Sequence, residues 1–224
     1  LEDNGMGDGV ANNDSVLNSN ISGVNTLEVN NQSISDLTGI ENFVAIQTLR
    51  CHENNLSNLN LTSNLSLITL NCSSNNLTTI DITSNISLLE LYINNNELDN
   101  LDISNNTSLN SLDCGENNLS NLKLTNNLNL NELYCGYNQL NNLNVSSLNA
   151  LSTLNCSFNS IANLSGVADL TSLKDLNAQN NLITSLDLSS NEALEYIKLG
   201  NNLLWLLSIS NGNNILLSEL NTLY

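Results

Sequence analysis

The fold is decided by two consecutive stretches of equal length, L-N-S-L-D-C-G-E-N-N-L-S-N-L-K-L-T-N-N-L-N (residues 109–129) and L-N-E-L-Y-C-G-Y-N-Q-L-N-N-L-N-V-S-S-L-N-A (residues 130–150). Both follow one 21-residue pattern, whose consensus along the chain is L-x-x-L-x-C-x-x-N-x-L-x-x-L-x-L-x-x-N. A fixed period of this length is the signature of a solenoid, in which each unit buries its apolar side chains only by stacking on its neighbours. The chain is therefore expected to form one elongated repeat domain.

The strands of this solenoid are predicted by the position that cysteine occupies in most units. This cysteine row contains Cys51, Cys72, Ile93, Cys114, Cys135 and Cys156 and, after one-residue insertions on either side, Val29, Ala178 and Leu199. A leucine or isoleucine two residues before the row alternates with it, and this period of two predicts a short strand with one buried face. Identical strands that recur once per unit should pair in parallel and in register. The remaining apolar positions are too closely spaced for a helix of two turns, so the other side of each unit should be extended or 3₁₀-like.

An asparagine stands three residues after the cysteine row. We expect its amide to turn the chain out of the strand and to satisfy backbone groups of its own unit and of the next one, which would otherwise be buried without partners. We call this set the asparagine ladder: Asn54, Asn75, Asn96, Asn117, Asn138, Asn159, Asn181 and Asn202.

These residues resemble the leucine-rich repeat, whose L-x-x-L-x-L-x-x-N segment is represented here by L-S-T-L-N-C-S-F-N (residues 151–159). The turns D-L-T-G-I (residues 36–40) and N-L-S-G-V (residues 163–167) are similar to those of bacterial internalin-like repeats. The Asn-rich form of the unit most resembles secreted repeat proteins of Bacteroidetes that end in a type IX sorting domain. The resemblance implies a right-handed leucine-rich repeat solenoid, with a concave parallel sheet of about ten strands and a mostly extended or 3₁₀ convex side. It implies no single function, because one fold serves many.

The two ends depart from the repeat. We expect the remnant of an N-terminal cap and its connection over residues 1–22, the repeat array over residues 23–215, and a degenerate or truncated C-terminal unit over residues 216–224. Apolar ends without a cap favour self-association, so contact between copies through these ends is a further expectation.

Charge narrows the range of partners. The chain carries 22 acidic and 4 basic residues and a formal net charge of −18. Such a surface repels phosphate backbones and anionic lipids, which argues against nucleic acid and acidic membranes as partners. No apolar run approaches the roughly 20 residues that span a bilayer. Because the chain begins Leu-Glu-Asp and shows no signal peptide, we interpret it as a mature or trimmed form of an extracellular or cell-surface protein whose signal and sorting segments lie elsewhere.

The cysteines and the single histidine do not indicate catalysis. The cysteine row points into the core, where Ile93 and Ala178 fill the same position, so free, buried, structural thiols are expected. His52 follows Cys51, and consecutive strand residues face opposite sides, which disfavours a catalytic pair. There is no C-x-x-C motif beside a histidine to hold zinc. We therefore expect no enzyme, no metal and no cofactor.

One loop-like stretch leaves a metal question open. Residues 3–14 combine aspartates, asparagines and glycines, which suggests calcium. However, Gly5 and Gly7 occupy the third and fifth positions of an EF-hand loop, and no glutamate closes it. A Gly-rich connection between cap and repeats is the favoured interpretation.

The outward positions of the strands are the place to expect a binding site. Most are small and polar, but aromatic and acidic side chains cluster on neighbouring units in a chain whose aromatic content is only 4%. Exposed aromatics on such a background are typical of recognition surfaces. The candidate binding residues on the concave face are Tyr92, Asp113, Glu116, Glu132, Tyr134, Tyr137 and Phe158.

The sequence therefore predicts a non-catalytic recognition or adhesion module of an exported bacterial protein, which binds a protein partner through its concave face. Two alternatives stay open. Tyr92, Tyr134 or Phe158 could stack on sugar rings in a glycan-binding module whose carboxylates bind the sugar hydroxyls, or the chain could be a rigid spacer attached to a catalytic domain outside it.

Overall fold

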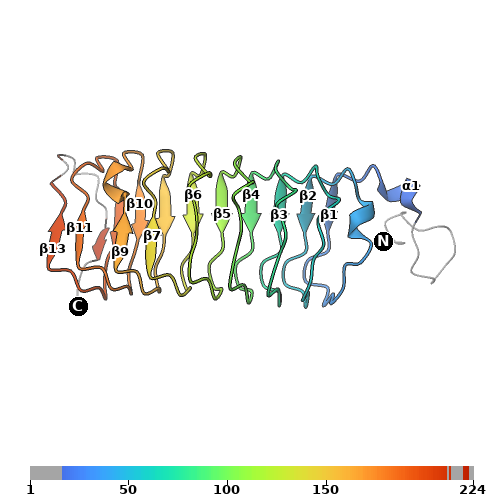
Figure 1. Cartoon of the computed structure of the whole chain (residues 1–224), viewed down its shortest axis with the longest axis horizontal. Helices are drawn as coiled ribbons and strands as arrows, with labels where there is room; N and C mark the ends of the chain where they lie inside the picture. Colours follow the sequence, from blue (N-terminus) through green and yellow to red (C-terminus); the bar gives the residue numbers. More distant parts are fainter. Residues whose placement is uncertain (1–16, 211, 213–218, 222–224) are drawn as a thin grey trace.

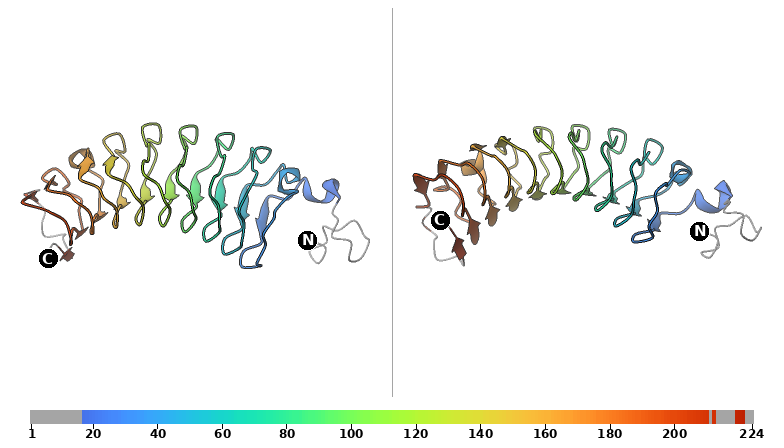
Figure 2. Two further views of the ribbon diagram at one scale, coloured as in Figure 1. Left: turned by 60° about the horizontal axis from the view of Figure 1, so that its bottom comes forward. Right: turned by 90° about the horizontal axis from the view of Figure 1, so that it is seen from below.

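The structure is a computed structural model that describes residues 17–210, 212 and 219–221 (Figure 1). The chain winds into a curved solenoid, and a parallel sheet lines the inner, concave side of the arc (Figure 2). The calcium question at residues 3–14 lies outside the described residues. So do most of the residues assigned to the N-terminal remnant and to the final unit.

The main sheet has ten strands of three residues each, as predicted from the repeat. They are β1 (Thr26–Glu28), β2 (Thr48–Arg50), β3 (Thr69–Asn71), β4 (Glu90–Tyr92), β5 (Ser111–Asp113), β6 (Glu132–Tyr134), β8 (Thr153–Asn155), β10 (Asp175–Asn177), β12 (Tyr196–Lys198) and β14 (Glu219–Asn221). Every pairing is parallel and joins equivalent residues, for example Leu91 with Leu112 and Leu112 with Leu133. Equivalent side chains therefore form straight rows along the molecule.

The convex side is extended or 3₁₀ in conformation, as expected. Short strands pair there as β7 (Asn142–Asn144) with β9 (Asn163–Ser165), and β11 (Ser185–Asp187) with β13 (Leu206–Ser208). The 3₁₀ helices η2 (Ile40–Asn42) and η3 (Val167–Asp169) occur in the two units that are one residue longer than 21. Each follows a glycine with positive φ, and a Cβ on Gly166 would lie 2.3 Å from the Ser146 Cα, so glycine is required there.

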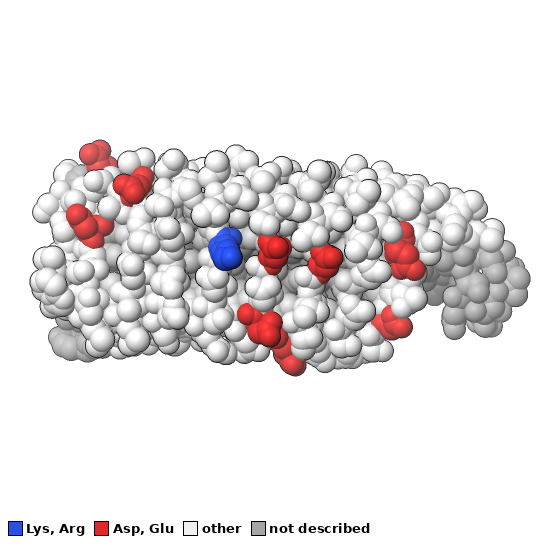
Figure 3. Space-filling view, in the orientation of Figure 1, with Lys and Arg blue, Asp and Glu red and all other residues white. Residues whose placement is uncertain are grey.

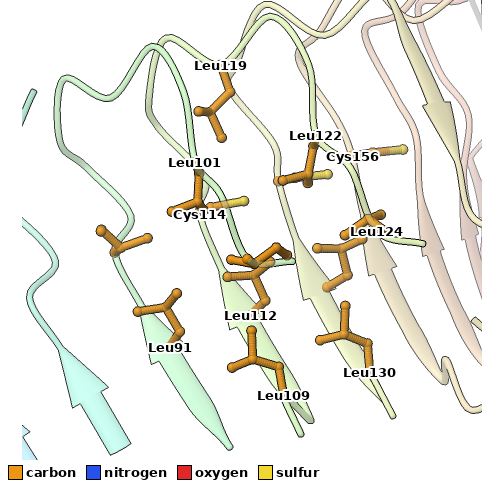
Figure 4. Close-up of a cluster of buried hydrophobic side chains, with 14 of the residues drawn as sticks. Leu91, Leu101, Leu109, Leu112, Cys114, Leu119, Leu122, Leu124, Leu130 and Cys156 are labelled. Carbon is orange, nitrogen blue, oxygen red and sulfur yellow. The ribbon is translucent and has the colours of Figure 1, made fainter. Parts of the chain in front are cut away.

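One hydrophobic core runs the length of the array. The helix α1 (Asn18–Ile21) contributes the buried Ile21 at one end, and stacked leucines continue from unit to unit as far as Leu199. The close-up in Figure 4 shows Leu91 and Leu112 on neighbouring strands, with Cys114 and Cys156 inside the coils. Because each unit shares its apolar surface with two neighbours, no unit has a core of its own.

The asparagine ladder closes each unit by hydrogen bonds. The Asn117 Oδ1 accepts from the Leu98 N–H at 3.0 Å, and its Nδ2 donates to the carbonyls of Ile93, Cys114 and Gly115 at 3.0–3.2 Å. The bonds therefore link each asparagine to its own unit and to the preceding one. The prediction that each asparagine would bond to the following unit was wrong. The side chain points back toward the preceding unit and bonds to its backbone instead.

A second asparagine row is buried on the convex side, thirteen residues after the cysteine row. Its members are Asn64, Asn85, Asn106, Asn127 and Asn191, all with 0% exposure. The Asn106 Nδ2 donates to the carbonyls of Ile82 and Asn85 in the preceding unit at 3.0 and 2.9 Å. The consensus contains this residue, but the sequence alone assigned it no role.

Candidate functional site

The tyrosine row, defined as the residue immediately before the cysteine row, faces outward at the end of each main-sheet strand. Tyr92, Asp113 and Tyr134 end β4, β5 and β6, and the register pairs Tyr92 with Asp113 and Asp113 with Tyr134. The three side chains are therefore consecutive in one row, and each is partly exposed. Glu132 begins β6 and lies on the same face as Tyr134, because residues two apart on a strand point to the same side.

Most other members of the tyrosine row cap a backbone amide. The side-chain oxygens of Asn71, Asp113, Asn155 and Asn177 each accept the N–H of the residue two positions later at 3.1–3.3 Å. A tyrosine cannot bend back to make this bond. The amides of Asn94 and Gly136, which follow Tyr92 and Tyr134, consequently lack the cap that their counterparts receive. Placing tyrosine at these positions forfeits a hydrogen bond whose net contribution to folding is about 1 kcal/mol.

Glu116, Tyr137 and Phe158 do not lie on strands. They belong to the turn row, two residues after the cysteine row, and every member of this row is in the left-handed region with φ of 52–57°. Its members are Asn31, Glu53, Ser74, Asn95, Glu116, Tyr137, Phe158, Asn180 and Asn201. The sequence had placed this row on the outward strand face. The strands end earlier because the asparagine ladder turns the chain immediately after the cysteine row.

Tyr137 and Phe158 form an exposed aromatic pair in this turn row. Their ring centroids are 4.2 Å apart with an interplanar angle of 9°, so the rings stack along the solenoid axis. Tyr137 is 53% and Phe158 36% exposed. Left-handed backbone is costly for bulky side chains, whereas Asn, which fills the row at four positions, tolerates it. The pair presents an apolar ridge beside the tyrosine row.

Carboxylates dominate the electrostatics of this surface. Partial burial raises the pKa of the Asp113 carboxyl above its ordinary value, and the neighbouring Glu116 adds to this rise. The pKa of Tyr134 is also raised, first by burial and then by the negative charges of Glu132, Asp113 and Asp175. Glu132 accepts a hydrogen bond from the Ser111 hydroxyl at 3.2 Å. The sequence did not indicate Asp175 as part of this surface. It lies on β10, two strands from Tyr134, and its influence depends on the three-dimensional arrangement.

The convex face differs from this surface. Its acidic side chains are scattered from end to end, with a basic side chain near the middle (Figure 3). Asp36, Asp81, Asp102 and Asp187 are fully exposed, and each accepts the N–H of the residue two positions later. Hydrogen bonds from the Thr and Ser hydroxyls, followed by these backbone hydrogen bonds, lower the pKa values of the four carboxyls.

The thiols are placed for packing. All five cysteines are free and buried, and burial raises the pKa of Cys51 and Cys156 to about 12. A thiol with such a pKa is protonated and unreactive at neutral pH. Cys51 is fully buried, whereas the adjacent His52 is partly exposed. Within the described residues, no group of three or more His, Cys, Asp or Glu side chains is arranged to hold a metal ion.

Among the described residues, no helix is long and apolar enough to cross a membrane.

Comparison with known proteins places this geometry in context. No protein-family model matches the chain, and no curated protein sequence matches it. Among solved structures, the chain is similar to the functional domain of InlJ from Listeria monocytogenes, which is described as including a cysteine ladder. That match has 36% identity and a TM-score of 0.82, and it covers 84% of this chain and 42% of the other. The chain thus spans less than half of the length of that structure.

Two further internalins of Listeria monocytogenes share the fold. InlF matches with 24% identity and a TM-score of 0.74 over 93% of this chain and 70% of its own. Internalin C2 matches with 25% identity and a TM-score of 0.70 over 82% of this chain and 84% of its own. The cysteine row of the present chain also forms a ladder, interrupted at Ile93.

Proposed function

Because this chain is an internalin-like leucine-rich repeat protein, we propose that it is the non-catalytic recognition module of an exported bacterial protein and binds a protein partner through its concave face. The binding surface comprises Tyr92, Asp113, Glu132 and Tyr134 on the strands of the concave sheet, together with Glu116, Tyr137 and Phe158 in the turn row beside them.

This proposal rests on one observation: aromatic side chains occupy positions where they lower the free energy of unfolding. Tyr92 and Tyr134 replace residues that would cap a backbone amide, and Tyr137 and Phe158 occupy left-handed backbone that suits Asn or Gly. The stack of Tyr137 on Phe158 returns some stability, whereas no hydrogen bond among the described residues replaces the caps that Tyr92 and Tyr134 forgo. Positions that break the local rules of a fold are expected at functional sites, and these aromatic positions are of that kind.

A protein ligand fits this surface better than a glycan. Sugars stack on the open faces of aromatic rings, but Tyr137 and Phe158 cover one face of each other. The pair therefore offers ring edges and an apolar ridge, which suit the side chains of a protein. A glycan array without hits agrees with this proposal, and reproducible hits abolished by Tyr134→Ala would overturn it.

The test is capture of partners by the immobilised chain from a mixture of secreted and cell-surface proteins, followed by binding measurements with each purified candidate. The double variant Tyr134→Ala/Tyr137→Ala should weaken binding of a true partner at least ten-fold. The convex-face variant Asp81→Asn/Asp102→Asn is the matched control and should bind as the parent chain does. A partner whose affinity is unchanged by the tyrosine substitutions would show that the concave surface is not the binding site.

A further inference from the structure

The centre of the tyrosine row has the geometry of a site for a single positive group. Tyr92 and Tyr134 flank Asp113 on adjacent strands, and neighbouring strands of a sheet lie about 4.8 Å apart. The two tyrosines are thus separated by about two strand spacings, with a carboxylate between them. A cation above Asp113 would lie about one strand spacing, roughly 5 Å, from each of the two strands that carry the tyrosines, and cations interact favourably with aromatic faces within roughly 6 Å.

The surroundings of this gap are negative. Glu132 lies on the same strand as Tyr134, Glu90 lies on the same strand as Tyr92, and Glu116 follows Asp113 in its own unit. Asp113 has only one hydrogen-bond donor among the described residues, the Gly115 N–H at 3.1 Å. Gly115 is tightly enclosed, since a Cβ there would lie 3.1 Å from the Gly136 carbonyl oxygen. The backbone beneath the Asp113 carboxylate is therefore tightly packed, and the carboxylate lies on the outward side of the sheet.

The two basic side chains of the tyrosine row are engaged elsewhere. Arg50 and Lys198 are the basic members of the tyrosine row, and they lie toward its two ends. Arg50 forms an ion pair with Glu28. Lys198 places its ammonium 5.0 Å from the centroid of the Tyr196 ring, which shows that this sheet accommodates a cation over a tyrosine. The central gap has the same components but lacks a cation of its own among the described residues.

We propose that the gap between Tyr92 and Tyr134 binds the ammonium or guanidinium group of a lysine or arginine that a partner protein presents, with Asp113 as its counter-ion. This inference rests on the proposed function and specifies the chemistry of the partner at this site. Glu132 and Glu90 add attraction at longer range.

The experiment is an NMR titration of the ¹⁵N-labelled chain in 0.15 M salt with three heptapeptides that differ only in the central residue. The sequence is acetyl-Gly-Ser-Gly-X-Gly-Ser-Gly-amide, with arginine, lysine or citrulline at X, and citrulline has the shape of arginine without its charge. We expect saturable shifts of the amides of residues 92, 113 and 134 with the charged peptides. Because one contact carries the binding, dissociation constants should be in the millimolar range, and the citrulline peptide should bind at least ten-fold more weakly.

Variants separate this site from the general negative field of the chain. Asp113→Asn keeps the amide cap, as Asn71 and Asn155 do in the same row, and should weaken the arginine peptide at least five-fold. Tyr134→Leu keeps an apolar side chain but removes the ring and should have a similar effect. The control Asp102→Asn removes the same charge from the convex face and should change affinity less than two-fold. Equal binding of the citrulline peptide, no effect of Asp113→Asn, or an equal effect of Asp102→Asn would each overturn the proposal.

The same variants distinguish this inference from the broader proposal. A protein partner that depends on Tyr134 and Tyr137 but binds the Asp113→Asn variant unchanged would refute the cation site and leave the recognition function standing. Conversely, occupation of the gap by the arginine peptide, without any protein partner that depends on these tyrosines, would refute the recognition function alone.

Discussion

At the scale of single residues, Asp113 carries a charge where three other members of the tyrosine row carry an amide. Asn71, Asn155 and Asn177 make the same cap with a neutral side chain. Partial burial and Glu116 raise the pKa of the Asp113 carboxyl, which means that the folded chain holds this proton more tightly than the unfolded chain does. The ionised carboxylate at neutral pH therefore destabilises the fold.

Asp113→Asn should consequently stabilise the chain at pH 7 by about 0.5–1 kcal/mol. The sign follows from linkage, because a raised folded-state pKa makes stability fall as pH rises from the ordinary value of 3.8 through the raised value. The stabilisation by Asp113→Asn should be complete above the raised pKa and should vanish below pH 3.8. Urea unfolding of both chains at pH 7 and pH 3 measures it. A gain of equal size at pH 3 would mean that the effect is not electrostatic.

The turn row gives a second prediction at this scale. Glu53 is exposed and has φ of 54°, a conformation that costs an L-residue about 1–2 kcal/mol but glycine almost nothing. Glu53→Gly should stabilise the fold by about 0.5–1 kcal/mol after the larger chain entropy of glycine is subtracted. The matched control is Glu97→Gly, at an exposed position without positive φ, which should destabilise it by a similar amount. Thermal unfolding of both variants gives the comparison, and stabilisation by both would contradict the backbone argument.

At the scale of elements, the asparagine ladder is the part of each turn that backbone hydrogen bonding cannot replace. The Asn117 Oδ1 is the acceptor for the buried Leu98 N–H. Asn117→Ala should cost about 1–3 kcal/mol, because it leaves that amide without a partner in the core. Replacement of the exposed neighbour Asn118 by Ala serves as the control and should change stability by less than about 0.5 kcal/mol. An unchanged unfolding midpoint for Asn117→Ala would remove the ladder from the account of stability.

The second asparagine row should behave differently. The Asn127 Nδ2 donates to the carbonyls of Ile103 and Asn106, but both carbonyls also accept backbone N–H groups. Its Oδ1 is buried without a hydrogen-bond partner among the described residues, and the next unit has Leu148 at this position. Asn127→Leu should therefore change stability by less than about 1 kcal/mol, since an amide with one unsatisfied oxygen is exchanged for an apolar side chain. A loss above about 2 kcal/mol would show that the amide bridge is essential.

The elements differ in how far the sequence could specify them. The period of 21 determines parallel pairing and register, because each unit repeats the same buried leucines. Period-two alternation does not reveal where a strand ends, so the turn row was predicted to lie on the sheet. Asn31, Asn95, Asn180 and Asn201 were a usable signal, since Asn favours left-handed backbone, but Glu, Tyr and Phe at other positions of the row obscured it. The uncapped amides two residues after Tyr92 and Tyr134 could not be predicted from the sequence. Side-chain hydrogen bonds decide which amides are capped, and the sequence pattern does not show these bonds.

At the scale of the whole molecule, stacking places like charges in rows. Asp81 and Asp102 lie on successive units of the convex side, and the charge of Asp102 opposes ionisation of Asp81. Strand spacing is about 4.8 Å, so charges one or two units apart interact across distances shorter than the Debye length of about 10 Å in 0.1 M salt. The net charge is −18, and the Arg50–Glu28 ion pair is only a minor attractive contact. Repulsion between carboxylates should therefore dominate the electrostatic contribution to stability.

Raising sodium chloride from 0.1 to 1 M shortens the Debye length to about 3 Å and should raise the melting temperature by roughly 3–6 °C. The same change should weaken arginine-peptide binding, because screening removes the attraction toward Asp113. Calorimetry and NMR titration at both salt concentrations test these opposite signs on one sample. At pH 3, where most carboxyls are neutral, the salt effect on melting should shrink. A melting temperature that falls with salt at pH 7 would mean that attractive pairs, not repulsion, govern the charged surface.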